Sequence, residues 1–245
     1  MPAGSATARK YAQTRLKSFA CQGRYEREAR LAGYQSIAGV DEVGRGSLFG
    51  PVFAAAVVLD PERPIRGLRD SKILSEERRE VLVARIRERA LAWAIGVADV
   101  FEIDRINIYQ ASLLAMRRAV EKLSPAADFL LLDAVKIHLP IAQRALIHGD
   151  AKSQCIAAAS ILAKTERDAC MRKWDEVFPH LGLCRHKGYS TEEHLRAIQT
   201  SGPTMLHRFS FEPVRLACPY PVWTGYDLKE NTAPAEAVSS DDATA

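Results

Sequence analysis

The spacing of hydrophobic and polar positions changes several times along the chain, and each change predicts a different element. Short apolar runs at 37–40 and 52–59 flank a glycine-rich loop and predict two neighbouring strands. Further strands are predicted at 93–100 and 145–148, and the unbroken apolar run at 129–132 is typical of a central strand covered on both faces. Strands that first follow one another and then alternate with helices indicate an α/β domain with a mixed sheet.

Amphipathic segments between these strands predict the helices that flank the sheet. A short helix is expected near 25–31, and a longer one follows Ser75, whose hydroxyl is well placed to cap it. Helical spacing also covers 103–123. A long helix is expected from Ser153 onward, where small residues on one side would let it pack closely against the sheet.

Composition and charge divide the chain into four regions. With 245 residues, of which 47% are hydrophobic and 26% charged, the chain can bury one good-sized core and a small appendage. The region beyond the long helix is rich in helix breakers and cations, with a short helix capped by Thr191 or Ser190. We therefore expect a basic N-terminal extension at 1–34 and a sheet domain at 35–175. A C-terminal helical appendage that binds the substrate is expected at 176–226, and a disordered acidic tail at 227–245.

The formal net charge of +4 conceals a basic body. From Asp227 onward five acidic residues stand against one lysine, whereas residues 1–34 hold seven lysines and arginines against two glutamates. A basic surface favours an anionic partner, although charge alone does not identify that partner as nucleic acid.

Cysteine usage and hydropathy bear on the compartment. No apolar run approaches the roughly 20 residues that span a bilayer, and the N-terminus lacks the apolar core of a secretory signal. The five cysteines are an odd number without a C-x-x-C pair, which favours free thiols. His180, Cys184 and His186 approach the spacing of zinc ligands but have no fourth ligand nearby. We expect a cytoplasmic protein without a membrane partner, and nothing in the sequence requires it to be other than a monomer.

Acidic residues follow three of the predicted strands: Asp41 and Glu42 follow the first, Asp133 the fourth and Asp150 the fifth. If those strands are neighbours and run the same way, their carboxyl ends would bring the acids together. Such a cluster repels itself, and hard oxygen ligands without His or Cys favour Mg²⁺ or Mn²⁺. Asp41 and Glu42 would point to opposite faces of a regular strand, so both serve one site only if the strand ends or bends there.

The glycine-rich loop adds a complementary element. Gly44, Arg45 and Gly46 could expose backbone N–H groups and a guanidinium to a phosphate or to a nucleotide edge. Glycine and aspartate are also ordinary turn formers, so the residues alone leave a metal–phosphate site and a solvated hairpin loop both open.

The whole segment DEVGRGSLFGPVFAAAVVL resembles the signature of ribonuclease HII, the bacterial type 2 ribonuclease H. Further segments of that family agree in order and spacing: DSK at 70–72, the strand-ending Asp133, Gly149-Asp150 before IAAASILAKTERD, HKGYST, and GPTMLHRFSF. The resemblance covers about residues 35 to 215.

This resemblance implies a ribonuclease H-like fold and a phosphodiester hydrolase. The implied enzyme is an endoribonuclease that cleaves the RNA strand of RNA/DNA hybrids and nicks duplex DNA 5′ to single embedded ribonucleotides, as in ribonucleotide removal from DNA. A two-metal-ion mechanism with Mn²⁺ or Mg²⁺ would leave 5′-phosphate and 3′-hydroxyl ends. The catalytic and metal-binding residues carried over are Asp41, Glu42, Asp133 and Asp150.

The resemblance also implies a site that recognises the ribonucleotide through its 2′-OH. The residues carried over for substrate binding are Gly44, Arg45, Gly46, Lys72, Lys187 and Tyr189, with Tyr189 stacked on the sugar at the RNA–DNA junction. The chain departs from the family pattern at Ser47, where Pro is common, and at Ala134 and Ser190, where Gly is common. Ser190 is expected to restrict the backbone beside Tyr189, and Asp168 is expected to be a structural partner. The alternatives are a DNA-specific or type 1-like nuclease on the same fold, and a nucleic-acid-binding protein without catalysis.

Overall fold

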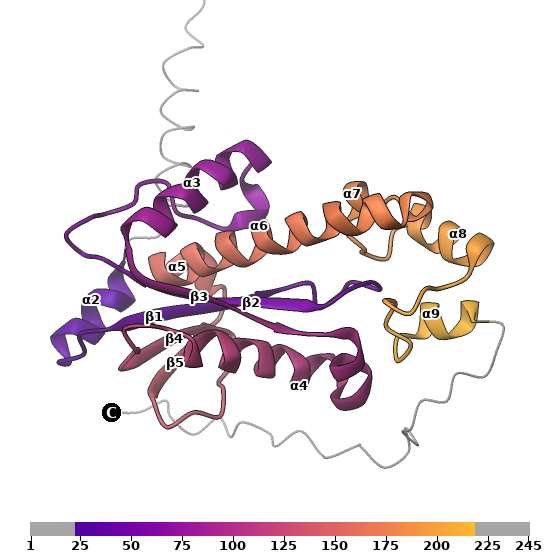
Figure 1. Cartoon of the computed structure of the whole chain (residues 1–245). Coiled ribbons are helices and arrows are strands. Elements are labelled where there is room, and N and C mark those ends of the chain that lie inside the picture. Colours follow the sequence, from indigo (N-terminus) through magenta and orange to yellow (C-terminus); the bar gives the residue numbers. More distant parts are fainter. Residues whose placement is uncertain (1–22, 219–245) are drawn as a thin grey trace, which may run out of the picture.

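A mixed five-stranded sheet forms the centre of the protein (Figure 1). The computed structural model describes residues 23–218, so most of the predicted N-terminal extension and the acidic tail lie outside the described residues. The strand order is β3-β2-β1-β4-β5; β1 pairs antiparallel with β2 and parallel with β4. The strands are β1 (Ile37–Val43), β2 (Val52–Leu59), β3 (Ala90–Ala98), β4 (Phe129–Asp133) and β5 (Ala142–Leu146).

Helices cover both faces of this sheet. Figure 1 shows α3 and α6 on one face and α4 on the other, which confirms the predicted mixed α/β architecture. The helices are α2 (Arg24–Leu31), α3 (Glu76–Arg89), α4 (Val100–Glu121), α5 (Gly149–Lys152), α6 (Gln154–Val177), α7 (Leu183–His186), α8 (Glu192–Ser201) and α9 (Glu212–Ala217), with 3-10 turns η1 (Ser71–Ile73) and η2 (Pro179–Leu181).

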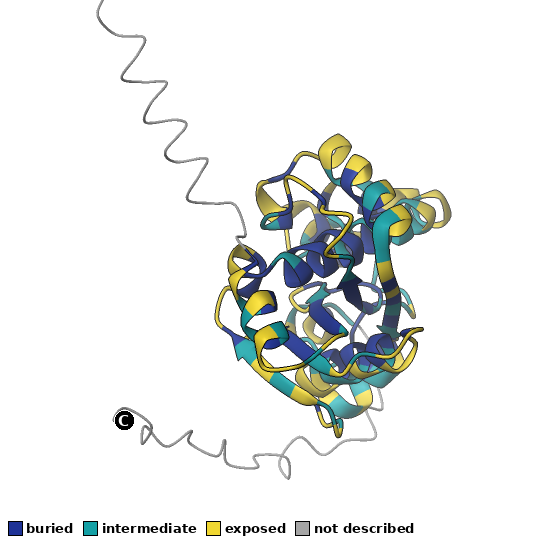
Figure 2. Ribbon diagram, turned by 90° about the vertical axis from the view of Figure 1, so that its left-hand side faces the viewer, coloured by how far each residue is buried: buried dark blue, intermediate teal, exposed yellow. Residues whose placement is uncertain are grey.

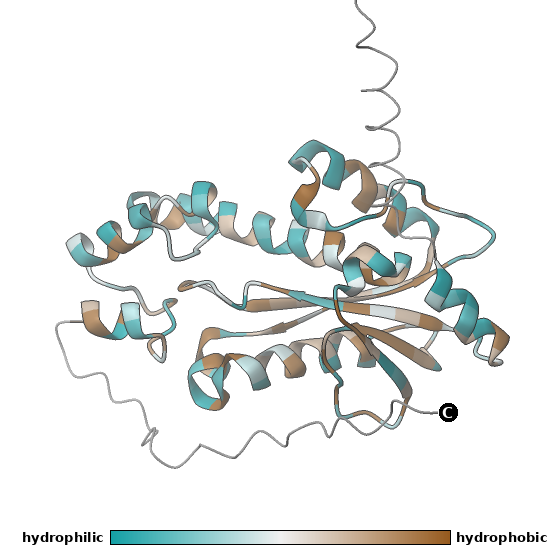
Figure 3. Ribbon diagram, turned by 180° about the vertical axis from the view of Figure 1, so that it is seen from behind, coloured by the Kyte–Doolittle hydropathy of each residue, from teal (hydrophilic) through white to brown (hydrophobic). Residues whose placement is uncertain are grey.

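Residues of β2 alternate between two hydrophobic layers. Ala54 and Ala56 pack with α4, whereas Ala55 and Val57 pack with α3 and α6, as the two-residue period of a strand requires. Buried residues run along the strands in Figure 2, and Figure 3 shows hydrophobic residues on the strands and on the helix faces turned to them. The continuous apolar run of β2 is thus explained by burial on both faces.

Close packing of α6 on β1 depends on a glycine. A Cβ atom at Gly39 would lie 2.0 Å from the carbonyl carbon of Cys155, a distance that no side chain tolerates. The predicted small residues of α6 include Ala158 and Ala159, both fully buried on this face. The helix therefore runs directly over the strand that carries Asp41.

Three predicted strand boundaries are wrong, each for a local reason. The strand expected at 93–100 is β3, which ends at Ala98 because Asp99 caps α4 by accepting the Glu102 N–H at 2.8 Å. The strand expected at 145–148 is β5, an edge strand that begins at Ala142 with alternating rather than continuous burial. β1 continues to Val43, because β2 still pairs with it there.

α7 lies beside the C-terminal end of α6, and α8 and α9 lie beyond that end (Figure 1). Phe49 of the glycine-rich loop packs with Met171 of α6 and with Leu181 and Leu183, and it closes a small core there. α6 extends past the predicted boundary at 175 to Val177. The division into a sheet domain and an appendage remains a prediction.

Candidate active site

Asp41 and Asp133 stand side by side on neighbouring parallel strands. The register of β1 and β4 pairs Val40 with Leu132, and each aspartate is the next residue along its strand. Asp41 is only 6% exposed and accepts a hydrogen bond from Ser160 of α6. The parallel pairing of β1 and β4 thus places these two acids side by side, as the sequence pattern predicted.

Glu42 does not need a strand end to approach this pair. β1 runs on through Glu42, which pairs with Ala54 of β2, so the expected end of the strand at this point is wrong. Burial raises the pKa of the Glu42 carboxylate, and the nearby charge of Asp133 raises it further. Arg45 lies on the other side of Glu42, with its Nη1 atom 3.4 Å from Oε1.

Asp150 comes from α5 rather than from a strand end. β5 stops at Leu146, and α5 begins at Gly149, whose N–H donates to Oδ1 of Asp133 at 2.7 Å. This hydrogen bond joins the start of α5 to the end of β4. Asp150 is 6% exposed; burial raises its pKa, and the charges of Asp70 and Asp133 raise it further.

The DSK segment places a cation among these acids. Asp70 caps η1 by accepting the Lys72 N–H at 2.8 Å, and Ser71 lies 2.9 Å from Ser160 between their Oγ atoms. Burial lowers the pKa of Lys72, but neighbouring carboxylates outweigh it and raise the pKa overall; they are Asp150, Asp70, Asp41 and Asp133. Lys72 therefore lies at the acidic site rather than on an unrelated surface.

Burial and mutual repulsion make the charged form of this site costly. Burial raises the pKa of Asp41 well above its usual range, and the charges of Glu42 and Asp133 raise it further. Burial likewise raises the pKa of Glu42 and of Asp150, opposed by Arg45 and Lys72 respectively. Within residues 23–218 no three His, Cys, Asp or Glu side chains are already gathered as ligands of one ion. The four carboxylates interact through their charges without forming a finished coordination shell.

The glycine-rich loop and the HKGYST segment are adjacent. Ser47 and Tyr189 form an isolated β-bridge, and the Leu48 N–H donates to the Gly188 carbonyl at 2.8 Å. Gly44 has a φ of 94°, and a Cβ there would lie 2.2 Å from Nε of Arg167. The structure therefore brings the predicted tyrosine next to the predicted loop, which follows Asp41 and Glu42 in the chain.

Two buried arginines that the sequence reasoning did not single out hold this loop. Arg167 of α6 donates to the Ser47 hydroxyl at 2.7 Å and to the Lys187 carbonyl at 2.9 Å. Arg208 donates to the carbonyls of Gly50 at 2.9 Å and Arg45 at 3.0 Å. Both lie inside motifs that carry the family resemblance, TERD and LHRFSF, which is the signal that could have identified them.

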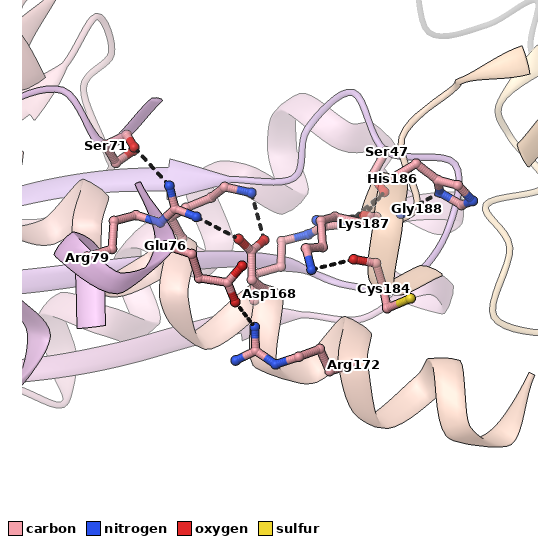
Figure 4. A network of polar contacts seen from close by, with 12 residues as sticks. Ser47, Ser71, Glu76, Arg79, Asp168, Arg172, Cys184, His186, Lys187 and Gly188 are labelled. Carbon is pink, nitrogen blue, oxygen red and sulfur yellow. Dashed lines mark hydrogen bonds and ion pairs between the residues drawn. The ribbon is translucent and has the colours of Figure 1, made fainter. Parts of the chain in front are cut away.

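The Lys187 ammonium is already hydrogen-bonded within the protein, unlike that of a surface lysine that is free to contact a phosphate. Its ammonium donates to the Cys184 carbonyl at 2.6 Å, as Figure 4 shows, while its own carbonyl accepts from Arg167. Asp168 pairs with Lys164 at 2.6 Å and with Arg79 at 3.5 Å, and so it is a structural partner.

Two of the three departures from the family pattern have contrasting backbone conformations. Ala134 has a φ of 56°, a left-handed conformation in which glycine is favoured, directly after Asp133. Ser190 has no such positive φ, so serine brings no left-handed strain next to Tyr189. The expected restriction of the backbone beside Tyr189 stays a prediction.

Comparison with known proteins agrees with this geometry. The sequence profile described as Ribonuclease HII matches residues 38–214. The chain is 63% identical over 204 residues to a ribonuclease HII of Solibacter usitatus (strain Ellin6076), which covers 83% of this chain and 90% of that protein. Among the described helices, none is both long and apolar enough to cross a membrane.

Solved structures show the same fold. The ribonuclease H2 of Pyrococcus horikoshii OT3 superposes with a TM-score of 0.64 at 23% identity, covering 75% of this chain and 97% of that one. Bst-RNase HIII in complex with Mn²⁺ gives a TM-score of 0.61 at 22% identity, covering 77% and 71%. The sheet is thus the ribonuclease H-like sheet that the motifs implied. The chain belongs to the ribonuclease HII family, whose members are ribonuclease H hydrolases.

Proposed function

We propose that the protein is a metal-dependent endoribonuclease that cleaves the RNA strand of RNA/DNA hybrids and nicks duplex DNA 5′ to a single embedded ribonucleotide. The observation that carries the proposal is the position of Asp133, which interacts with Asp41, Glu42 and Asp150 beside the loop that begins at Gly44. Acidic side chains next to a glycine loop could hold metal ions that bind a phosphodiester. This function accounts for their burial better than a solvated hairpin loop does.

The donor set fits hard divalent cations. Asp41, Glu42, Asp133 and Asp150 offer only carboxylate oxygens, which Mg²⁺ and Mn²⁺ prefer over softer ligands. Burial raises the pKa values of Asp41, Glu42 and Asp150, so bound divalent cations would favour the charged form of these carboxylates. Divalent ions bound there would supply Lewis-acid stabilisation of the phosphorus centre and of the departing 3′ oxygen, in a two-metal-ion reaction that leaves 5′-phosphate ends.

The residues of the chain would position the scissile nucleotide. Gly44, Arg45 and Gly46 would meet the 2′-OH and adjacent phosphate through backbone groups and the half-exposed Arg45 side chain. Tyr189 would stack on the sugar of the following nucleotide. Lys72 would contact a phosphate, while Lys187 would contribute mainly through its backbone because Cys184 already holds its ammonium.

The remaining assignments follow from this function. The region 176–226 would bind the duplex as an appendage to the catalytic region 35–175, and the basic residues of 1–34 would add to its electrostatic attraction. We propose that the enzyme acts as a monomer in the cytoplasm, in the removal of ribonucleotides from DNA.

A duplex with one ribonucleotide tests the proposal directly. Incubation with Mn²⁺ or Mg²⁺ should give a nick on the 5′ side of the ribonucleotide, and Asp133→Asn should abolish that nick while duplex binding persists. An all-DNA duplex of the same sequence is the control. Cleavage of the all-DNA duplex would point to a DNA-specific nuclease. Cleavage of long hybrids alone would point to a type 1-like enzyme, and binding without any product would point to a non-catalytic protein.

A further inference from the structure

One buried side chain touches both segments to which substrate recognition is assigned. Arg167 is 0% exposed; its Nη2 atom donates to the Ser47 hydroxyl at 2.7 Å and its Nη1 atom donates to the Lys187 carbonyl at 2.9 Å. The guanidinium carbon lies 5.3 Å from the centre of the Tyr189 ring. Its Nε atom occupies the space that a side chain at Gly44 would need. Arg167 therefore contacts the loop, the segment before Tyr189 and the tyrosine ring at once.

Ser47 completes this connection. Its hydroxyl accepts the hydrogen bond from Arg167 and donates to the Phe49 carbonyl at 3.0 Å. Ser47 is 0% exposed and forms the β-bridge with Tyr189. The hydroxyl thus links the end of the glycine loop to the arginine that holds the other segment, and a residue without a hydroxyl would leave Nη2 with the Phe49 carbonyl alone, at 3.3 Å.

Stability does not explain the arginine. Arg208 is also 0% exposed and donates to the Arg45 carbonyl of the same loop, so two cations are buried near each other. Within residues 23–218 neither guanidinium forms a salt bridge, and Nε of Arg167 and Nη2 of Arg208 have no hydrogen-bond partner. Burial lowers the pKa of both, that of Arg208 to about 9. Buried cations without a salt-bridge partner cost stability even when carbonyls, a hydroxyl and aromatic rings contact them, and apolar side chains of similar volume would cost less.

We propose that Arg167 and Ser47 are a positioning pair that fixes the 44–46 loop against Tyr189, so that the two segments recognise one ribonucleotide as a single rigid unit. This rests on the proposed function, because it assigns the pair a role in the discrimination of a ribonucleotide from a deoxyribonucleotide. The physical reason is that a 2′-OH contact and a sugar-stacking contact reinforce each other only if their spacing is held before the substrate arrives.

The test measures discrimination rather than turnover. Binding of two duplexes that differ by one 2′-OH is compared in an Asp133→Asn background, alone and combined with Ser47→Ala, Tyr189→Ala or both. We expect Ser47→Ala to reduce the preference for the ribonucleotide duplex about tenfold, the loss of one charge-assisted hydrogen bond. In the Tyr189→Ala background the same change should have no further effect, because the pair acts through the tyrosine.

Three results would overturn the proposal: Ser47→Ala keeps the full preference, Ser47→Ala reduces the preference equally in both backgrounds, or the parent binds both duplexes alike.

Ser201→Ala is the matched control, since its hydroxyl donates to the Ala197 carbonyl at 2.7 Å within α8, away from the loop. Arg167→Lys keeps the charge but loses the two-pronged contact, and where it folds it should reduce the preference further. If the wild-type protein nicks the duplex but Ser47→Ala retains the preference, only the positioning role fails. If Ser47→Ala reduces the binding preference for the ribonucleotide duplex as expected but the wild-type protein cuts no duplex, only the nuclease function fails.

Discussion

The Nε2 atoms of His194 and His207 lie 3.2 Å apart in the interior of the C-terminal region. The Thr204 N–H donates to Nδ1 of His207, which leaves the proton of His207 on Nε2 to donate to His194. His194 then carries its own proton on Nδ1 and donates it to the Tyr189 carbonyl at 3.0 Å. A hydrogen-bonded chain of two neutral rings thus holds the backbone of Tyr189, the residue predicted to bind the substrate.

Acid should destabilise this arrangement. Burial lowers the pKa of His194 to about 4 and of His207 to about 3, below the value of about 6.5 in an unfolded chain. The unfolded state therefore binds protons first, so the stability that the neutral rings contribute is complete above about pH 6.5 and falls as the pH drops toward 4. Each ring should lower the free energy of unfolding by up to about 1.4 kcal/mol per pH unit in that window. Urea unfolding between pH 5 and 7 measures the slope.

His207→Gln should flatten that slope, whereas His138→Gln, at an exposed position, should leave it unchanged. An unaltered slope in His207→Gln would show that the histidine pair does not control the acid sensitivity.

Asp133→Asn should separate stability from activity. The substitution keeps an oxygen for the Gly149 N–H but removes a charge that adds to burial in raising the pKa values of Asp41, Glu42 and Asp150. The variant should therefore melt at a higher temperature than the wild type in chelator, and it should not cleave. Thermal melting with and without EDTA measures this difference.

Divalent ions should stabilise the wild type and not Asp133→Asn. Selective binding to the folded state contributes about 2.7 kcal/mol at an ion concentration one hundred times the dissociation constant. Glu192→Gln, at an exposed position of α8, should keep the full response to Mn²⁺. An equal response in wild type and Asp133→Asn would contradict the assignment of Asp133 as a ligand.

Ala134→Gly should stabilise the protein by about 1 kcal/mol, because Ala134 has a φ of 56° that a Cβ atom disfavours. The same substitution at Ala169, inside α6, should destabilise by about 1 kcal/mol through lost helix propensity. Chemical denaturation of the two variants gives both values. Destabilisation by Ala134→Gly would mean that its methyl group makes a contact worth more than the strain.

Lys72 and Lys187 should differ in their effect on substrate binding. Lys72→Met removes a cation at the acidic site and should lower the slope of log affinity against log salt by about one unit. Lys187→Met should change the slope less, because the Cys184 carbonyl already holds its ammonium. Duplex titrations over a range of salt concentrations measure both slopes, and equal slopes would show that Lys187 releases its ammonium to the phosphates.

Local residue patterns are enough to predict the elements and the candidate acids. Apolar runs and caps such as Ser75 and Thr191 act over a few residues, so their spacing predicts strands and helices directly. Predicted boundaries were wrong where a local interaction competed, as when Asp99, directly after the end of β3, caps α4. The ordered motifs also indicated the family, because they are a property of residue order alone.

How these residues meet depends on the folding of distant segments against one another. Asp41 lies beside Asp133 because β1 and β4 pair in parallel, and Arg167 reaches Ser47 across 120 positions of sequence. The fold also places Lys72 and Lys187 in different environments, although both are lysines in family motifs. Spacing along the chain does not encode such contacts, since they arise from strand register and from the burial of side chains that come from distant segments.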